Sequence, residues 1–186
     1  MKNLIHAFFI PTSLLFLSIA SFANGLSGIS YSISIEKSDP RLAKIKVVFV
    51  PQDDLLYMSP GGAQLPKRWA TFVQNLRVVD EGERAISVTE LPDAKWKMEL
   101  PQKKKVTLSY EIRLDHENHK WSGGIDGVAF ARDWGVFYAG RTLLILNGNS
   151  WKNIAVDFDI PANWKATTPW TIASNKANSF RVSSLS

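Results

Sequence analysis

Hydrophobic and polar residues alternate with a period of two along most of this chain. The alternation is clearest over residues 106–114, and it recurs over residues 29–35, 43–49, 95–100 and 154–160. Successive side chains of a strand point to opposite faces, so the pattern is typical of strands with one buried face. No segment has the period of an amphipathic helix. Short strands separated by turns predict an all-β fold, either an antiparallel β-sandwich or a saddle-shaped sheet.

The most organised stretch runs from Gly135 to Trp164. Two apolar runs, one ending at Leu146 and one over residues 154–160, flank a turn that contains Asn147-Gly148. An Asn-Gly pair between two strand-like runs is a signal for a β-hairpin. We therefore expect these two runs to pair with each other.

Residues 52–68 interrupt the alternation. Proline and glycine at positions 60–62 and a further proline at position 66 break any period. A loop of this length is uncommon in a compact domain and is often functional or part of an interface. The alternative is a surface excursion held down by the apolar residues at positions 55–57. The sequence leaves both interpretations open.

The N-terminal segment has the features of a secretory signal peptide. A charged start and an apolar run over residues 4–20 precede the small residues of Ser21-Phe22-Ala23. The apolar run is short and contains Pro11, which favours a cleaved signal over an uncleaved membrane anchor. We expect a signal peptide over residues 1–23 and a single β-rich domain over residues 24–186. The expected location is the periplasm or the outside of the cell, with no membrane span after cleavage.

Composition excludes several classes of protein. The chain has no cysteine, which rules out a disulfide-stapled scaffold and any thiolate metal site. Its net charge of +5 is small and the basic residues are scattered, so nucleic acid is not an expected partner. The one basic cluster, Lys103-Lys104-Lys105, lies between two predicted strands and is interpreted as a solvated turn.

One cluster combines histidines with carboxylates. It is the segment from Asp115 to His119, in which His116 and His119 are three residues apart. Zinc peptidases use His-Glu-x-x-His on a helix, where a spacing of four places both imidazoles on one face. Here the spacing differs and the segment follows a strand, so we expect a solvated polar loop. We predict no metal, no cofactor and no catalysis. A metal hydrolase that uses His116 and His119 is the weaker alternative.

The chain contains seven tryptophans, at positions 69, 96, 121, 134, 151, 164 and 170. Trp96 alternates with apolar neighbours and is expected in the core. Trp121, Trp134 and Trp151 lie near predicted turns, where an exposed indole could stack on a sugar ring. These three are the candidate ligand-stacking residues of an alternative function, a free-standing periplasmic module that binds glycan or peptide.

Several short pieces occur in an order that is similar to a known family. They are Tyr31-Ser32-Ile33-Ser34-Ile35, Pro60-Gly61, Trp69-Ala70-Thr71-Phe72-Val73, Asn75-Leu76, Asp80-Glu81-Gly82, Trp96, Leu108-Ser109-Tyr110-Glu111-Ile112, Gly135-Val136-Phe137-Tyr138-Ala139-Gly140-Arg141 and Ile160-Pro161-Ala162-Asn163-Trp164-Lys165. In this order they resemble the N-terminal domain of the glycyl aminopeptidase family, secreted zinc metallopeptidases that often also carry a PDZ domain. The resemblance extends from Ile29 to Trp170.

This resemblance implies a β-rich accessory domain without catalysis. In the family, the catalytic domain follows this one and carries the His-Glu-x-x-His zinc motif. No position here matches that motif, so no catalytic residue is carried over. The implied role is to brace or dock a peptidase catalytic domain, in the same chain or a separate one. The candidate interface residues are Phe137, Tyr138, Trp164 and Trp170.

The signal peptide leads to a direct prediction. If residues 1–23 are removed on export, mass spectrometry of the exported protein should find Asn24 at the N-terminus. An exported protein that still carries residues 1–23 would contradict the prediction.

Overall fold

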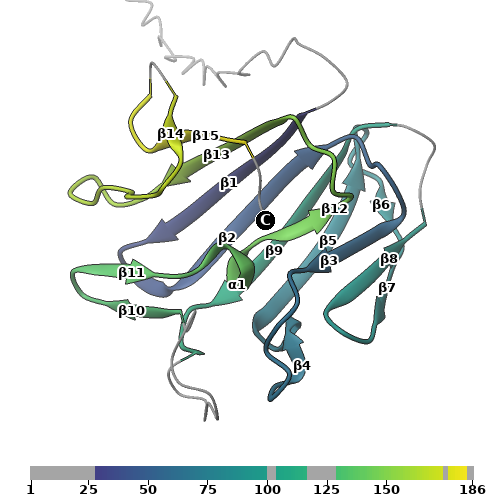
Figure 1. Cartoon of the computed structure of the whole chain (residues 1–186), viewed down its shortest axis with the longest axis horizontal. Coiled ribbons are helices and arrows are strands. Elements are labelled where there is room, and N and C mark those ends of the chain that lie inside the picture. Colours follow the sequence, from purple (N-terminus) through teal and green to yellow (C-terminus); the bar gives the residue numbers. More distant parts are fainter. Residues whose placement is uncertain (1–27, 100–103, 117–128, 174–175, 184–186) are drawn as a thin grey trace, which may run out of the picture.

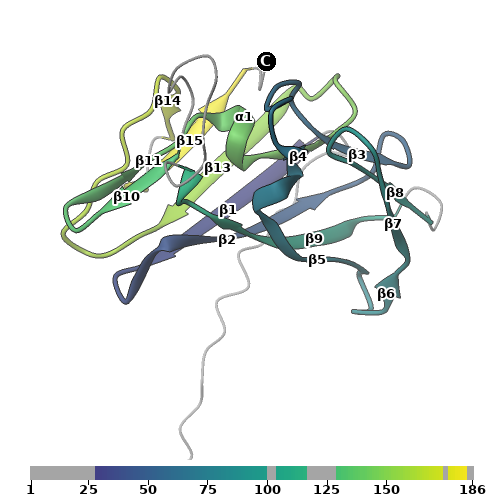
Figure 2. The ribbon, with the colours of Figure 1, turned by 90° about the horizontal axis from the view of Figure 1, so that it is seen from below.

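Two layers of β-sheet form the body of the molecule (Figure 1). The computed structural model describes residues 28–99, 104–116, 129–173 and 176–183. A large eight-stranded sheet makes one layer, and a four-stranded sheet covers part of one of its faces. Seen from below, the central strands of the large sheet lie on one side, with the smaller sheet and a helical turn on the other (Figure 2). The predicted all-β fold is confirmed.

The described elements have the following bounds. The large sheet contains, in spatial order, β14 (Thr171–Ile172), β15 (Ser179–Val182), β13 (Asn153–Asp159), β1 (Gly28–Glu36), β2 (Asp39–Phe49), β9 (Val106–Arg113), β5 (Val73–Asp80) and β6 (Ala85–Ile86). The small sheet contains β12 (Ile145–Asn147), β3 (Leu55–Met58), β8 (Lys95–Met98) and β7 (Val88–Leu91). A separate pair contains β10 (Phe130–Arg132) and β11 (Gly135–Phe137), and the remaining elements are β4 (Pro66–Trp69), the 3-10 turn η1 (Ala70–Phe72) and the helical turn α1 (Gly140–Leu143).

The described helices are single turns. Within the described ranges, no helix has the length and apolarity needed to cross a membrane.

The inner face of the large sheet is the main hydrophobic core. Tyr31 pairs with Val47 of β2 and Val156 of β13, and Val47 pairs with Leu108 of β9. All four side chains in this row are fully buried. The serines of β1 lie on the opposite, polar face. The period of two therefore separates a buried face from a wet one, as the sequence predicts. One pair differs from a purely antiparallel arrangement, because β1 and β13 run parallel.

Two buried tyrosines join the layers. The Tyr31 hydroxyl donates to the carbonyl of Ile145 at 2.9 Å. The Tyr110 hydroxyl accepts from the amide of Ile145 at 3.0 Å and donates to the carbonyl of Leu143 at 3.0 Å. Burial raises the pKa of both tyrosines, so both hydroxyls stay protonated and able to donate. They satisfy backbone groups of Ile145 in β12 and Leu143 in α1 that would otherwise be costly to bury.

Asn147 fixes the segment before β3 to the end of β12. Its Oδ1 accepts from the amide of Gln52 at 2.8 Å. Its Nδ2 donates to the carbonyls of Asp53 and Leu55, both at 2.9 Å, and contacts Oδ1 of Asp53 at 3.1 Å. The side chain is almost completely buried. Each polar atom of this amide has a partner, which is what makes its burial affordable.

The predicted hairpin between Gly135 and Trp164 is wrong. The first apolar run is divided into β11, α1 and β12, and β12 pairs with β3 instead of β13. The second run, β13, pairs with β1 and β15. Asn147-Gly148 is therefore a turn between two sheets. The side chain of Asn147 bonds to the segment before β3, so its tertiary contacts outweigh the local hairpin preference.

Residues 52–68 are more ordered than a loop. They contain β3, which pairs with β8 and β12, and most of β4. Gly61 and Gly62 have φ angles of 137° and 66°, in the region that favours glycine. A Cβ on Gly61 would lie 2.9 Å from Nε1 of Trp69, so the backbone can approach this indole only because the side chain is absent. The segment is held on the core by packing and by short strands, not by a periodic pattern.

His116 is not in a solvated loop, contrary to the sequence-based prediction. Its side chain is completely buried and stacks on Phe72 with ring centroids 3.6 Å apart, and on Trp69 at 6.1 Å. The amide of Ala129 donates to Nδ1 of His116 at 3.2 Å, and the amide of His116 donates to the carbonyl of Ala129 at 3.1 Å. A ring nitrogen that accepts a hydrogen bond carries no proton. His119 lies outside the described residues.

The buried amide of Asn147 generates a stability prediction. Asn147→Ala should reduce the free energy of unfolding in urea by about 3 kcal/mol, because it leaves three backbone groups near Gln52 and Leu55 without their partner. The control is Asn149→Ala, two residues away and exposed, which should change it by less than about 0.5 kcal/mol. Equal losses in the two variants would show that the hydrogen bonds of Asn147 carry little energy.

The stacked imidazole generates a second prediction. His116→Ala should lower the free energy of unfolding by about 3 kcal/mol, because it opens a cavity between Phe72 and Ala129. His116→Phe keeps the ring and should lose only about 1–2 kcal/mol, from the unpaired amide of Ala129. Calorimetric or urea unfolding measures both. A negligible loss in His116→Ala would refute the stacked position.

Candidate functional site

A short hairpin carries the most exposed aromatic side chains of the described chain. Strands β10 and β11 pair with Arg132 opposite Gly135, which leaves Asp133 and Trp134 as a two-residue turn. Trp134 is 77% exposed at this turn, and Phe137 is 51% exposed on β11. Two three-residue strands are marginally stable alone, so the hairpin depends on packing against the rest of the domain.

The base of the hairpin is tied to the core. Ala129 and Ala131 are buried, and the backbone of Ala129 exchanges hydrogen bonds with His116. Phe130 stacks on Phe137 with centroids 5.5 Å apart. The hairpin therefore presents its tip while its base is fixed.

A row of aromatic rings continues from the hairpin toward the edge of the large sheet. Tyr138 lies 6.4 Å from Phe158, Phe158 lies 5.8 Å from Phe180, and Phe180 lies 6.5 Å from Trp170. Edge-to-face and tilted ring pairs of this kind are favourable beyond the area they bury. Burial raises the pKa of Tyr138, so its hydroxyl stays neutral.

The connection from β13 to β14 borders this row. The amide of Trp164 donates to the carbonyl of Pro161 at 2.8 Å, which closes a turn. The amide of Ala166 donates to Oδ1 of Asn178 at 2.9 Å, which holds the connection on the sheet. Beyond it, Ile172 of the edge strand β14 is 66% exposed.

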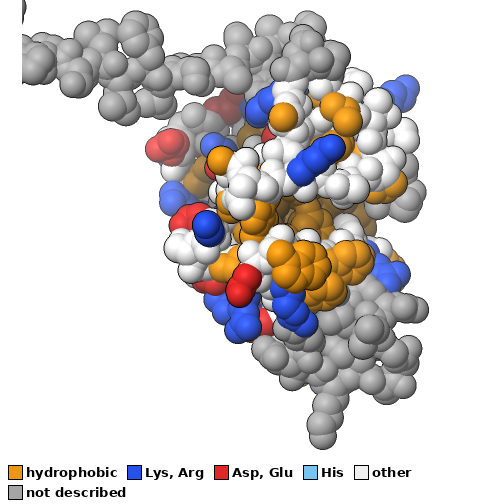
Figure 3. Space-filling view, turned by 90° about the vertical axis from the view of Figure 1, so that its left-hand side faces the viewer, with side chains coloured by type: hydrophobic (Ala, Val, Ile, Leu, Met, Phe, Trp, Pro, Cys, Tyr) orange, Lys and Arg blue, Asp and Glu red, His pale blue; other side chains and the backbone are white. Residues whose placement is uncertain are grey.

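These segments form one surface, which we call the aromatic face. The β10–β11 hairpin and the connection before β14 lie on the same side of the molecule, at the left of Figure 1. From that side, hydrophobic side chains gather around a recess (Figure 3). The aromatic face comprises Phe130, Trp134, Phe137, Tyr138, Phe158, Trp164, Trp170 and Ile172.

The chemistry of the aromatic face suits binding. Apolar rings and an aliphatic side chain dominate it, and Arg132 lies 5.0 Å from the ring of Phe130 as the cation of a cation–π pair. Exposed apolar side chains that cluster are typical of an interaction surface. They supply neither a nucleophile nor a general base.

The four candidate interface residues have different exposures. Phe137 is half exposed, whereas Tyr138, Trp164 and Trp170 are half-buried and pack against the core. Ring contacts link Tyr138 to Trp170 through two phenylalanines. Their use as an interface stays a prediction.

The three candidate ligand-stacking tryptophans also differ. Trp134 presents its indole to solvent. Trp151 is half-buried, packs edge-on against Phe49 at 6.2 Å, and donates its indole N–H to the carbonyl of Asn147. It is therefore engaged in the fold. Trp121 lies outside the described residues.

The described ranges place no group of three or more His, Asp or Glu side chains where they could hold a metal ion. His116 stacks against Phe72 and Trp69, and His119 lies outside the described residues. The absence of a cofactor stays a prediction.

Sequence reasoning missed several members of the aromatic face. Ile172 lies in a two-residue strand, too short to show a period. The alternation over residues 154–160 places Phe158 on the buried face of its strand, but it is only half-buried because it lies near the end of β13 and packs toward the aromatic face. Trp134 is not among the missed residues, because its place near a predicted turn marks it as a candidate for exposure.

Comparison with solved structures supports the fold. An aminopeptidase N family protein from Idiomarina loihiensis has a TM-score of 0.65 and 16% identity over 84% of this chain and 27% of its own. An M1 zinc metallopeptidase from Deinococcus radiodurans has a TM-score of 0.43 and 12% identity over 84% of this chain and 38% of its own. The first match indicates a shared fold, and the second is too distant to support an argument. The chain spans less than half the length of either protein.

Comparison with curated proteins found no match. The family model described as the Peptidase M61 N-terminal domain matches residues 30–186, which is most of the chain. The match agrees with the resemblance seen in the sequence. This chain therefore belongs to the Peptidase M61 N-terminal domain family.

Proposed function

We propose that this chain acts as the non-catalytic N-terminal domain of a glycyl-aminopeptidase-type metallopeptidase, and that its aromatic face braces the peptidase domain. The observation that carries the proposal is the exposure of Trp134 and Phe137 beside a half-buried aromatic row. Family membership supports the kind of partner. The residues at positions 1–23 support a location in the periplasm or outside the cell.

Energetics favour a partner that is linked to this domain. Complete burial of Trp134 and Phe137 would contribute roughly 5 kcal/mol, at about 25 cal/mol per Å² of apolar surface. Association of two free proteins costs about 4–15 kcal/mol before any contact is counted. These two side chains alone would not hold a free partner, so measurable association of separate domains also needs the contacts of the rest of the aromatic face. A covalent link supplies a high effective concentration, so a modest face is sufficient.

A second function has one specific observation in its favour. Trp134 is exposed at the tip of a fixed hairpin and has Asp133 and Arg132 beside it. An exposed ring with polar neighbours can stack on a sugar and hydrogen-bond its hydroxyls. A free-standing glycan- or peptide-binding module is therefore the alternative.

The docking proposal predicts a selective loss of binding. Calorimetric titration of this domain against a separately purified peptidase domain of the same family should show association that Trp134→Ala and Phe137→Ala each weaken by about tenfold or more. Lys95→Ala, exposed on β8 outside the aromatic face, should leave it unchanged.

The same variants separate the two functions. If oligosaccharides quench the fluorescence of Trp134 and the peptidase domain does not bind, the glycan-binding module is the correct function. If Trp134→Ala and Phe137→Ala bind the peptidase domain as tightly as the parent chain, the aromatic face is not the docking surface.

A further inference from the structure

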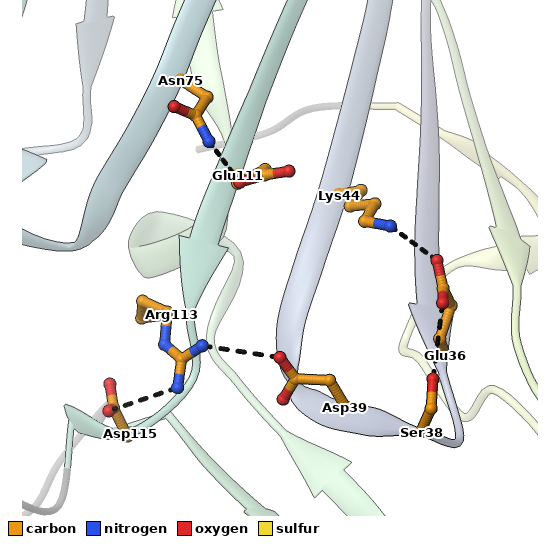
Figure 4. Close-up of polar contacts among 8 residues, drawn as sticks. All are labelled: Glu36, Ser38, Asp39, Lys44, Asn75, Glu111, Arg113 and Asp115. Atoms are coloured by element: carbon orange, nitrogen blue, oxygen red, sulfur yellow. Dashed lines mark hydrogen bonds and ion pairs between the residues drawn. The ribbon is translucent and has the colours of Figure 1, made fainter.

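The outer face of the large sheet is polar, and several of its cations are already paired. Nζ of Lys44 lies 2.6 Å from Oε1 of Glu36 (Figure 4). The guanidinium of Arg113 lies 3.5 Å from Asp39 and 3.9 Å from Asp115 (Figure 4). Carboxylates thus neutralise these two cations within the face itself.

Two neighbouring cations on the same face are not neutralised in this way. Lys46 of β2 and Arg77 of β5 both pair with Ser109 of β9, one from each side. Among the described residues, no carboxylate forms an ion pair with Lys46 or Arg77. Adjacent strands are about 4.8 Å apart, so the backbone positions of Lys46 and Arg77 are about 10 Å apart, and Ser109 lies between them.

A β-bulge places Arg77 in this row. Gln74 pairs with Glu111 and Arg77 with Ser109, so three steps along β5 match two along β9. The extra residue restores Arg77 to the outer face. Asn75 in the bulge has a φ angle of 53°, and its Nδ2 donates to Oε2 of Glu111 at 2.6 Å (Figure 4). Asn75 thus adopts a left-handed backbone conformation at the bulge, and this bulge positions Arg77 on the outer face.

The row borders a hollow of about 350 Å³. Lys46, Arg77, Thr107 and Ser109 contribute N–H and O–H donors to it. The volume is sufficient for a small oxyanion with part of the molecule that carries it.

Three carboxylates also border the hollow, and two of them are occupied. Asp80 accepts from the amides of Gly82 and Arg84 and from the Arg84 side chain. Oε1 of Glu81 lies 4.0 Å from Nζ of Lys105. Glu83 also lines the hollow and has no ion pair within the described ranges, so its charge opposes an anion there without being offset by a partner.

We propose that Lys46, Ser109 and Arg77 form a binding site for a tetrahedral oxyanion, a phosphate or sulfate group. Charge-assisted hydrogen bonds from an ammonium and a guanidinium are the strongest that a side chain offers to such a group, and the guanidinium binds two of its oxygens at once. The site lies on the outer face of the large sheet and is independent of the aromatic face.

Phosphate titration followed by NMR tests the site. Inorganic phosphate, against sodium chloride of equal ionic strength, should cause saturable shifts at the amides around Ser109. A Lys46→Ala/Arg77→Ala double variant should bind about tenfold more weakly or not at all. The control is a Lys44→Ala/Arg113→Ala double variant, which removes the same charge from the same face but spares the row. It should bind as the parent does.

Opposite results overturn the proposal. Shifts that chloride reproduces, or equal losses in both double variants, would indicate general screening of charge. A further variant tests the rim: Glu83→Gln should tighten phosphate binding by about two- to threefold, because it removes the opposing charge. The circular dichroism spectra of all variants should match that of the parent, since every substituted side chain is exposed or partly exposed on the polar face.

Vesicles distinguish the two sources of phosphate. If the natural ligand is a lipid headgroup, the protein should sediment with phosphatidylglycerol vesicles, and the Lys46→Ala/Arg77→Ala variant should not. Saturable phosphate binding without sedimentation would indicate a soluble phosphate ester. If neither inorganic phosphate nor the vesicles bind, the site does not exist.

Discussion

The arrangement of the two layers depends on a few hydrogen bonds between the side chains of one sheet and the backbone of the other. Strand β12 lies over the large sheet as an edge strand of the described part of the small sheet, so part of its buried backbone has no neighbouring strand there. Tyr31 and Tyr110 reach up from the inner face and satisfy Ile145 and Leu143. A buried amide or carbonyl without a partner costs about 1–3 kcal/mol, so this contact specifies where the second layer can lie. Apolar packing alone would permit several positions.

The position of β12 also determines where part of the aromatic face lies. The helical turn α1 leads directly into β12, and β11 and Tyr138 precede it. At its other end, Asn147 fixes the segment that leads into β3. Because the chain between β11 and β12 is short, fixing β12 also limits where the hairpin can stand. The exposed tryptophan of that hairpin is therefore held at a defined place although its own two strands are short.

Local pattern and tertiary contact explain which parts of the fold the sequence predicts. The central strands β1, β2 and β9 follow from alternation, because a buried face needs apolar residues whichever strand lies beside it. Pairing does not follow in the same way. Asn147-Gly148 has the local form of a hairpin turn, yet the Asn147 amide bonds to a segment about ninety residues earlier, and the flanking strands enter different sheets. His116 was misplaced for the same reason, since only the fold brings Phe72 and Ala129 around it.

The candidate sites show the same limit more sharply. Trp134 and Trp151 both lie near turns in the sequence. Trp151 packs against Phe49 and donates a hydrogen bond to the carbonyl of Asn147, whereas Trp134 is exposed. Lys44 and Lys46 are two residues apart on one face of β2, and within the described part of the chain only the first forms an ion pair with a carboxylate. The register of β1 and β2 decides that difference, because it places Glu36 near Lys44. The bulge at Asn75 in turn decides that Arg77 lies on the outer face, and no sequence signal marks it.

The domain separates its two kinds of surface by the two faces of one sheet. Apolar rings continue from its inner face to the edge, and unpaired cations remain on its outer face, so a partner bound at one leaves the other open to solvent.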